Sequence, residues 1–514
     1  MLRRKPSPVR RPPGGRGPGG AVRLALRLLF LRLAGPRALP PAVRQVLLTL
    51  RAHRFEAFAV GGGVRDTLLG LRPVDWDVAT SAEPRYVMSV FPRTLPIGLR
   101  HGTVRVICPD GTEVDVTTYR REGPYSDGRR PDHVTFTGSL EDDLSRRDFT
   151  VNALALSLQG KVTDPYGGLC DLVRGIVRTV GPPEDRFNED ALRMMRAVRL
   201  AGQLGFSLDP ATARAIRKDA RLLRRVSVER IRDEFERCLV LPGPAAARTL
   251  EDLRSLGLLG CFIPELLETV GFVQNEHHRY TVWEHTLRVV SGVPPVLHLR
   301  LAALLHDVGK PRTLTVKDGR RHFFGHEKVG AAMAGEILDR LRYGKALRNR
   351  VVHLVRHHMA LRWQPGMKDA AVRRLINRVG PENIDDLVTL RRADRRATGT
   401  AGGRGDRETA ALLVRVQRLT RSGGAYTVSD LAVDGADVMR VGGIGPGPKV
   451  GMVLRRLLEE VLEDPDLNER SRLEERIREI LTAAAPRACE GRAEGRPDRG
   501  ADRHRHKTHR QKEE

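Results

Sequence analysis

Aromatic residues are scarce in this chain of 514 residues, at 4% of the sequence. Proteins that bind single strands mainly by stacking need such side chains, so that class is disfavoured. The five cysteines fit neither a disulfide framework nor the paired spacing of a zinc site. The apolar runs are too short for a transmembrane segment, so no membrane partner is expected. These absences favour a protein of the reducing cytoplasm.

Acidic residues are too few to balance the basic ones. Lys and Arg total 89 against 63 Asp and Glu, a formal net charge of +26. Such an excess predicts a polyanionic partner such as RNA, bound in a salt-dependent way. Residues 1–40 contain no acidic residue at all and predict a disordered basic arm.

A glycine-rich turn followed by two aspartates is the first candidate site. Strand-like residues 58–60 lead into Gly61-Gly-Gly-Val-Arg-Asp-Thr-Leu-Leu-Gly70. Glycines beside a helix N-terminus let the backbone approach a bulky anion. Asp75 and Asp77 follow in a predicted strand, 75–78, which places both carboxylates on one face. The pair either binds a divalent cation such as Mg²⁺ or is a solvated surface pair.

A third carboxylate is predicted close to this pair. Two strand-like runs, 102–108 and 112–119, are joined through Pro109-Asp-Gly111, a strong hairpin signal. Asp115 lies in the second run. If the hairpin lies beside the strand of the aspartate pair, three carboxylates converge on one or two metal ions. Such a centre supports phosphoryl-type displacement.

A base-recognition site is predicted on a later helix. Asn188 is the expected N-cap of a helix over residues 189–199. Asp190 and Arg193 lie on its polar side, as an acceptor beside a donor. Cytosine and adenine both present an exocyclic amine next to an acceptor, so this pair can select them. The alternative is an ion pair on the helix surface.

Taken in order, these motifs resemble the class II tRNA nucleotidyltransferase and bacterial poly(A) polymerase family. The resemblance extends over Asp143-Leu-Ser-Arg-Arg-Asp-Phe-Thr-Val-Asn152, Asp164-Pro-Tyr-Gly-Gly-Leu-Cys-Asp-Leu172 and Glu189-Asp-Ala-Leu-Arg-Met-Met-Arg196. It implies an α+β fold, with a polymerase-β-like nucleotidyltransferase head built on a mixed sheet. An all-α neck, an HD domain and a helical C-terminal region follow. The implied catalytic residues are Asp75, Asp77 and Asp115, with Mg²⁺ on Asp75 and Asp77. The implied nucleotide-binding residues are Gly61, Gly62, Arg65, Arg146, Arg147, Asp148, Asn152, Asp190, Arg193 and Arg196.

A second metal site is predicted further along the chain. His306 and Asp307 end the apolar helix pattern of Arg300-Leu-Ala-Ala-Leu-Leu-His-Asp-Val-Gly-Lys310, and with His285 and Asp394 they make a mixed N/O ligand set for a second divalent metal. Further imidazoles come from His326, His353, His357 and His358. This segment resembles an HD domain of the His-Asp phosphohydrolase superfamily. Both phosphoester hydrolysis and a metal-stabilised scaffold that grips RNA are open interpretations.

The predicted domains are a basic arm (1–40), the catalytic head (41–180), a base-recognising and RNA-binding neck (181–272), the HD domain (273–400), a linker (401–424), a helical RNA-binding region (425–484) and a disordered tail (485–514). The resemblance implies addition of CCA to tRNA 3′ ends from CTP and ATP, by attack of the RNA 3′-hydroxyl on the α-phosphate. CC addition, A addition and poly(A) tailing are alternatives within the family. An HD phosphohydrolase as the main activity and a non-catalytic RNA-binding module are alternatives from other classes.

Overall fold

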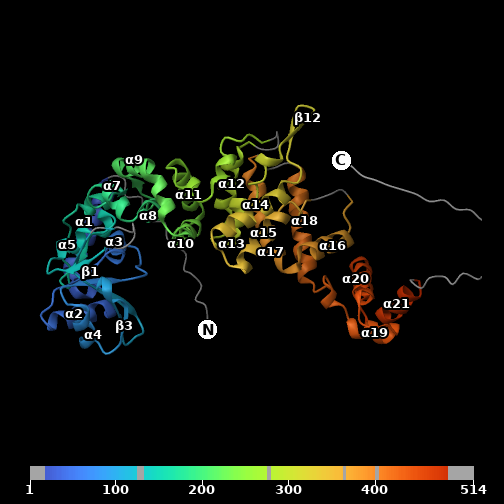
Figure 1. Ribbon diagram of the computed structural model, residues 1–514, viewed down its shortest axis with the longest axis horizontal. Helices are drawn as coiled ribbons and strands as arrows, with labels where there is room; N and C mark the ends of the chain where they lie inside the picture. The colour runs from blue at the N-terminus through green and yellow to red at the C-terminus, as the bar shows by residue number, and fades with distance from the viewer. Residues whose placement is uncertain are drawn as a thin grey trace, which may run out of the picture. The chain divides into compact units, whose positions relative to one another are not determined.

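The computed structural model describes residues 18–123, 125, 132–274, 279–362, 366–399 and 404–483 (Figure 1). The expected tail (485–514) and the first 17 residues of the expected arm lie outside the described residues. Contacts divide the chain into two compact units. The first comprises Met1–Met367 with Arg378–Arg421, and the second comprises Lys368–Asn377 with Ser422–Glu514.

A seven-stranded mixed sheet forms the head, in the order β3-β4-β5-β2-β1-β8-β9. The strands are β1 (Ala57–Val60), β2 (Asp77–Thr80), β3 (Thr94–Gly98), β4 (Thr103–Ile107), β5 (Glu113–Thr118), β8 (Ala155–Leu156) and β9 (Val162–Thr163). β2 and β5 run parallel, and the other neighbours run antiparallel. The strands β2 and β5 therefore begin at the same edge of the sheet.

Apolar side chains on both faces of the sheet hold the head together. α2 (Pro41–Ala52) packs against β1, β2 and β5, and its Val43, Val46 and Leu47 are completely buried. Another cluster includes Val60 and Tyr119. Full burial of each such side chain contributes roughly 1.5–3 kcal/mol. The other helices of the head are α1 (Pro18–Ala34), α3 (Gly62–Leu69), α4 (Pro84–Val90), α5 (Leu140–Ser145) and α6 (Gly168–Arg174).

Helices occupy two segments that were expected to lack structure. α1 lies within the expected disordered arm and buries Leu31. The expected linker, 401–424, contains α18 (Arg404–Arg421), which buries Leu412 and Val416 beside α17. In both segments, apolar residues at helical spacing pack against the neighbouring structure and outweigh the Arg- and Gly-rich composition.

The neck and the HD region are mainly helical, as predicted, but they are not all-α. In the neck β11 (Ser207–Leu208) pairs with β10 (Ile176–Val177), and in the HD region β12 (Thr315–Lys317) pairs with β13 (Arg320–His322). The neck helices are α7 (Pro183–Glu189), α8 (Leu192–Leu204), α9 (Pro210–Asp219), α10 (Val228–Leu239) and α11 (Gly243–Ser255). The HD helices are α12 (Val282–Gly292), α13 (Leu297–Leu305), α14 (His326–Arg340), α15 (Lys345–His357) and α17 (Ile384–Ala397). α8 packs against α10 and α11, and α11 packs against α12. The helix that carries Arg193, one of the residues predicted to recognise the base, is thereby held by the rest of the neck.

The second unit is built from α16 (Asp369–Val379), α19 (Gly435–Gly442), α20 (Pro448–Glu463) and α21 (Arg470–Ala483). Arg373 of α16 donates to the carbonyl oxygens of Leu462 and Glu463 at the end of α20, at 2.7 Å each. A basic side chain at this place satisfies carbonyl groups that lack partners within the helix. Among the described helices, none is long and apolar enough to span a membrane.

Candidate active site and metal centre

Asp77 and Asp115 lie side by side on neighbouring strands of the head. Asp77 is the first residue of β2 and Asp115 the third of β5, and the two are partners in the parallel pairing. The side chains of directly paired residues leave the same face of a sheet. The structure thus meets the condition on which the three-carboxylate prediction depended, because the hairpin strand that carries Asp115 lies beside the strand of Asp77.

Asp75 lies ahead of β2 and not within it. The predicted strand, 75–78, is wrong by two residues, because β2 begins at Asp77. The β1 partner of Asp77 is Val60, the last residue before Gly61 turns the chain, so β1 offers no backbone opposite Asp75. Asp75 is therefore exposed in the loop that leads into the strand.

The pKa of Asp77 responds to the charges of the neighbouring acidic groups. Burial raises the pKa of Asp77, the charge of Arg147 lowers it, and the charges of Asp115 and Asp75 raise it again. Like charges held this close repel unless a cation lies among them. Oxygen donors of this kind are what a hard divalent cation requires, so the residues present fit such an ion.

Gly61 allows the backbone to pass close to these groups. Its φ is +78°, and a Cβ atom there would lie 3.1 Å from Asp77 Oδ2 and 3.1 Å from Arg147 Nη1. α3 begins at the next residue, Gly62, so the N–H groups of its first turn lack partners within the helix. Backbone donors and the guanidinium of Arg147 thus lie beside the carboxylates.

Four predicted nucleotide-binding residues form one hydrogen-bonded chain. Arg65 Nη1 donates to Asn152 Oδ1 at 2.6 Å, and Asn152 Nδ2 donates to Asp148 Oδ1 at 3.0 Å. Arg196 of α8 donates to Asp148 Oδ2 through Nε at 3.0 Å and Nη2 at 2.5 Å. Burial alone would raise the pKa of Asp148, but the charge of Arg196 and the bonds from Asn152 and Arg196 lower it to about 2. An ionised Asp148 therefore joins the head to the neck.

Arg146 and Arg147 share one fully buried acid, Asp143. Arg147 Nη2 donates to Asp143 Oδ2 at 3.2 Å, and Arg146 Nε donates to Oδ1 at 3.0 Å. Arg146 also donates to Glu122 at the end of β6 (Arg120–Glu122), which pairs with β7 (Val134–Phe136). Most of the sequence between these strands lies outside the described residues. Asp143 holds Arg147 beside Asp77.

The predicted helix from Asn188 is interrupted at Asp190. α7 ends at Glu189, Asp190 is extended, and α8 begins at Leu192. Asn188 belongs to α7 and is not an N-cap, so that prediction is wrong. The physical reason is that Asp190 Oδ1 accepts a hydrogen bond from the backbone N–H of Leu192 at 3.1 Å and satisfies a donor at the start of α8.

Asp190 and Arg193 each bind a different partner. Arg230 of α10 donates to both oxygens of Asp190, with Nη1 at 3.2 Å from Oδ1 and Nη2 at 2.7 Å from Oδ2. Arg193 Nη1 donates to Glu189 and, at 3.3 Å, to the carbonyl oxygen of Arg186. The ion pair expected as an alternative, between Asp190 and Arg193, is thus replaced by two separate pairs that orient both side chains.

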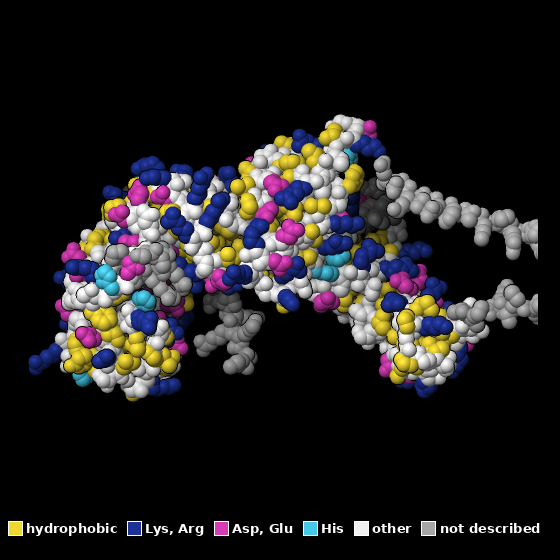
Figure 2. Space-filling model, viewed as in Figure 1, with side chains coloured by type: hydrophobic (Ala, Val, Ile, Leu, Met, Phe, Trp, Pro, Cys, Tyr) yellow, Lys and Arg dark blue, Asp and Glu magenta, His cyan; other side chains and the backbone are white. Residues whose placement is uncertain are grey.

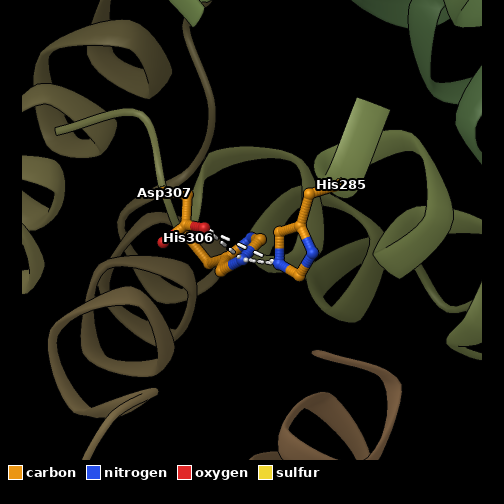
Figure 3. A group of neighbouring side chains, drawn as sticks. All are labelled: His285, His306 and Asp307. Carbon is orange, nitrogen blue, oxygen red and sulfur yellow. Dashed lines mark hydrogen bonds and ion pairs between the residues drawn. The ribbon is translucent and has the colours of Figure 1, made fainter. Parts of the chain in front are cut away.

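Three of the four residues predicted for the HD site, His285, His306 and Asp307, come together in the interior (Figure 3). His306 Nε2 lies 3.3 Å from His285 Nε2 and 3.1 Å from Asp307 Oδ2. Asp394 Oδ1 lies 3.1 Å from His285 Nε2. Burial would raise the pKa of Asp394, but its hydrogen bond with His285 and the charge of Arg391 lower it. The ligand atoms of His285, His306 and Asp307 all lie within 4.8 Å of one another, a set that suits a divalent metal, and Asp394 contacts this group through His285.

Family models match three successive parts of the chain. Residues 57–178 match the poly(A) polymerase head domain. Residues 205–269 match the probable RNA and SrmB binding site of polymerase A, and residues 276–399 match the HD domain. A CCA-adding enzyme of Lactiplantibacillus plantarum is 34% identical over 422 residues, which is 82% of this chain and 91% of that protein. The chain belongs to the class II CCA-adding enzyme and poly(A) polymerase family.

Two further members of the family show how the likeness is distributed. A CCA-adding enzyme of Anoxybacillus flavithermus is 51% identical over 222 residues, 43% of this chain and 55% of that protein. The chain spans about half the length of several curated relatives that it matches at this level. The crystal structure of the Bacillus stearothermophilus CCA-adding enzyme in complex with CTP is 31% identical, with a TM-score of 0.67, and the match covers 87% of this chain and 99% of that one.

Three charged residues that contact the predicted site residues were not predicted as site residues themselves, although Asp143 begins one of the motifs that carry the resemblance. Arg105 binds Asp115 with Nε at 2.7 Å and Nη2 at 3.1 Å, Arg230 binds Asp190, and Asp143 binds Arg147. Arg105 could have been found, because the predicted hairpin places it directly opposite Asp115 in the pairing of β4 with β5. Arg230 gives no such local signal, since it lies on another helix.

Proposed function

We propose that this protein adds CCA to the 3′ end of tRNA from CTP and ATP, without a nucleic-acid template, in the cytoplasm. The observation that carries the proposal is the parallel pairing of Asp77 with Asp115, with Asp75 just ahead of the strand. Carboxylates gathered beside backbone and guanidinium donors suit the transfer of a nucleotide from its triphosphate. Family membership supports the same reaction.

In this proposal the RNA 3′-hydroxyl attacks the α-phosphate, and pyrophosphate leaves. Mg²⁺ held by Asp75 and Asp77 would activate the hydroxyl and neutralise charge on the phosphates. Asp115 completes the carboxylate set and takes part in removing the hydroxyl proton. Its bidentate ion pair with Arg105 orients it for that role.

The triphosphate needs hydrogen-bond donors beside the glycine turn. Gly61 and Gly62 offer backbone N–H groups, and Arg147 offers a planar fork that matches phosphate oxygens. Arg65 and Asn152 are the next donors along the hydrogen-bonded chain that ends at Arg196. In our proposal, these hydrogen bonds hold the phosphate site at a fixed position relative to the neck.

Base selection falls to Asp190 and Arg193. The carboxylate accepts a hydrogen bond from the exocyclic amine of cytosine or adenine, and the guanidinium donates to the neighbouring ring acceptor. Arg193 Nη1 is engaged by Glu189, so the base contact uses the other nitrogen atoms of its guanidinium. Uracil and guanine present the reverse pattern, so an acceptor would face the Asp190 carboxylate and a donor would face the Arg193 guanidinium, which disfavours both bases.

The neck offers a surface for the RNA. Residues 210–225 expose a row of basic side chains, and Lys and Arg recur over the neck helices in Figure 2. The exposed residues are Arg214, Arg217, Lys218, Arg221, Arg224 and Arg225. Such charges bind phosphates without regard to sequence. This stretch lies within the part of the chain that matches an RNA-binding site of polymerase A.

The test is incubation with tRNA that lacks its last three nucleotides, with labelled CTP and ATP supplied separately and together. The proposal requires two cytidines with CTP alone and a final adenosine only when both are present. A product that stops at two cytidines, gains only adenosine or grows a long A tail would establish a different member of the family. Unchanged physiological activity of an Asp75→Asn, Asp77→Asn double variant would make the HD region the main active centre.

A further inference from the structure

Helix α1 packs one apolar face on the head and exposes a second apolar face to solvent. On the inner face Leu31 is buried, and a Cβ atom at Gly160 would overlap the carbonyl oxygen of Leu31. Arg27 reaches the end of α3, where a Cβ atom at Gly70 would lie 2.6 Å from Arg27 Nη2. These close contacts hold α1 in one orientation. The outer face consists of large apolar side chains, each at least 53% exposed: Val22, Leu26, Leu29, Phe30 and Leu33.

The outer face has the spacing of a coiled-coil seam. Its main residues follow one another at intervals of four, three and four, as positions d and a of successive heptads do: Val22, Leu26, Leu29 and Leu33. Phe30 takes the adjoining position e, and the buried Leu31 takes position f, opposite the seam. A helix that packs on a protein core shows a broader apolar stripe, whereas a narrow seam at positions a and d fits one partner helix. The spacing therefore indicates a helix as the partner of this face.

Basic side chains flank the seam on both sides. Arg23 takes position e and Arg32 position g, and both are exposed. Residues 1–40 contain no acidic residue, so α1 supplies no acid to pair with these arginines. Charges at positions e and g set the choice of partner in coiled coils. Two copies of α1 would bring arginines together, whereas a helix with Asp or Glu beside its own apolar seam is complementary.

The two ends of this chain do not have the composition of such a partner. Residues 1–17 contain no acid, and residues 485–514 contain no Leu, Ile, Val, Phe or Met that could enter the seam. RNA would pair with the arginines but would leave the apolar side chains in water. The match to the family's head domain begins at residue 57, after α1 has ended.

We propose that the outer face of α1 is a docking site for an acidic amphipathic helix of another protein. The partner packs its apolar seam along the residues from Val22 to Leu33 and pairs its acids with Arg23 and Arg32. Burial of the seam supplies the affinity, and the flanking ion pairs fix the register and the choice of partner. The inference goes beyond the proposed tRNA reaction and does not depend on it.

The test uses the full-length protein and two labelled synthetic peptides, each about three heptads long. Both peptides have Leu at positions a and d, and one has Glu and the other Lys at positions e and g. Fluorescence anisotropy should show binding of the Glu peptide with a Kd on the order of micromolar, and binding of the Lys peptide at least about tenfold weaker. An Arg23→Glu, Arg32→Glu double variant should reverse this preference.

The seam itself is tested by a Leu26→Gln, Leu29→Gln double variant, which should lose binding of the Glu peptide. Both side chains are exposed, so its thermal unfolding should match that of the wild type. The matched control is Leu48→Gln, an exposed leucine on α2 that lies outside the seam and should leave binding unchanged. All these variants should add nucleotides to tRNA at the wild-type rate.

Three results would overturn the proposal. The first is equal binding of the Glu and Lys peptides, and the second is wild-type binding by the Leu26→Gln, Leu29→Gln variant. The third is a different occupant of the seam. Self-association of the wild type in sedimentation that this variant abolishes would identify a second copy. Flotation of the wild type, but not of this variant, with anionic phospholipid vesicles would identify a lipid surface.

Discussion

Arg230 holds Asp190 through both carboxylate oxygens, at 3.2 and 2.7 Å. The two residues lie on different elements, since Arg230 belongs to α10 and Asp190 lies just ahead of α8. A bidentate pair of this kind fixes the plane of the carboxylate as well as its position. In the proposed reaction, the acid that reads the base amine is therefore oriented before any nucleotide binds.

Substitution of Arg230 by Lys should weaken base recognition. A lysine ammonium is a point charge that cannot hold both oxygens in one plane, so Asp190 would lose its orientation. We expect kcat/KM for CTP and ATP to fall about tenfold, which corresponds to about 1.4 kcal/mol. Discrimination against UTP should fall as well. Steady-state incorporation into tRNA lacking its last three nucleotides measures both effects.

The matched control is Arg237→Lys on the same helix. Arg237 has a largely exposed side chain and lies 3.6 Å from Glu234, away from Asp190. This variant should incorporate CTP and ATP as the wild type does. Equal rates and equal UTP discrimination in Arg230→Lys and Arg237→Lys would show that Arg230 does not position the base-recognition acid.

Substitution of Gly61 by Ala should reduce activity. With φ +78° and ψ −144°, Gly61 adopts a conformation that is essentially restricted to glycine and costs an alanine about 1–3 kcal/mol, and the new Cβ would press on Asp77 and Arg147 at 3.1 Å each. We expect nucleotide addition to fall at least tenfold because a displaced carboxylate loses its place beside Asp115. Gly111→Ala is the comparison, since Gly111 has a φ of +81° and no atom within 4 Å of its Cβ position. Both variants should unfold at a lower temperature than the wild type, Gly61→Ala by the larger amount, and equal activity in both would contradict the account.

Several strands of the head could be predicted because they depend on local sequence patterns. Alternating apolar residues identified β4 and β5, and the turn at Pro109-Asp-Gly111 set their pairing. The pairing of β5 with β2, which brings Asp115 beside Asp77, joins distant segments and stayed a condition until the structure showed it. The start of β2 was misplaced because it depends on where β1 ends. The periodicity of the residues around Asp75 carries no information about the residue at which β1 ends.

The motifs did not predict which residues of distant segments contact each other. Asp148 and Arg196 are 48 residues apart, and Asp190 and Arg230 are 40 apart. Each residue alone is compatible with a solvated surface charge. The break at Asp190 arises from its side-chain bond to Leu192, a local signal that competed with Asn188 as the expected cap.

Stability should depend on pH through Asp148. Its pKa is lowered from 3.8 to about 2, so the ionised carboxylate stabilises the fold above pH 3.8, and this contribution is lost as the pH falls towards 2. At 1.36 kcal/mol per pKa unit the contribution is about 2 kcal/mol. Asp148→Asn should therefore lose about this much free energy of unfolding at pH 6, with a further pH-independent loss because Arg196 loses its charged partner.

Urea unfolding between pH 6 and pH 2.5 measures this dependence. The difference between wild type and Asp148→Asn should shrink below pH 4. Asp185→Asn, an exposed position on α7, should differ little from the wild type at every pH. A difference for Asp148→Asn that stays constant down to pH 2.5 would show that its carboxylate is not held in the ionised form.

Single-turnover addition of cytidine by Asp77→Asn tests the central claim most directly. The substitution keeps the size of the side chain and removes a charge from the carboxylate set, whose arrangement with Asp115 carries the proposed chemistry. We expect the rate with saturating Mg²⁺ and CTP to fall by roughly three orders of magnitude or more, about 4 kcal/mol of barrier. Asp110→Asn, at the exposed hairpin turn, should keep the wild-type rate. A rate for Asp77→Asn within tenfold of the wild type would contradict the assignment of this carboxylate set as the active centre.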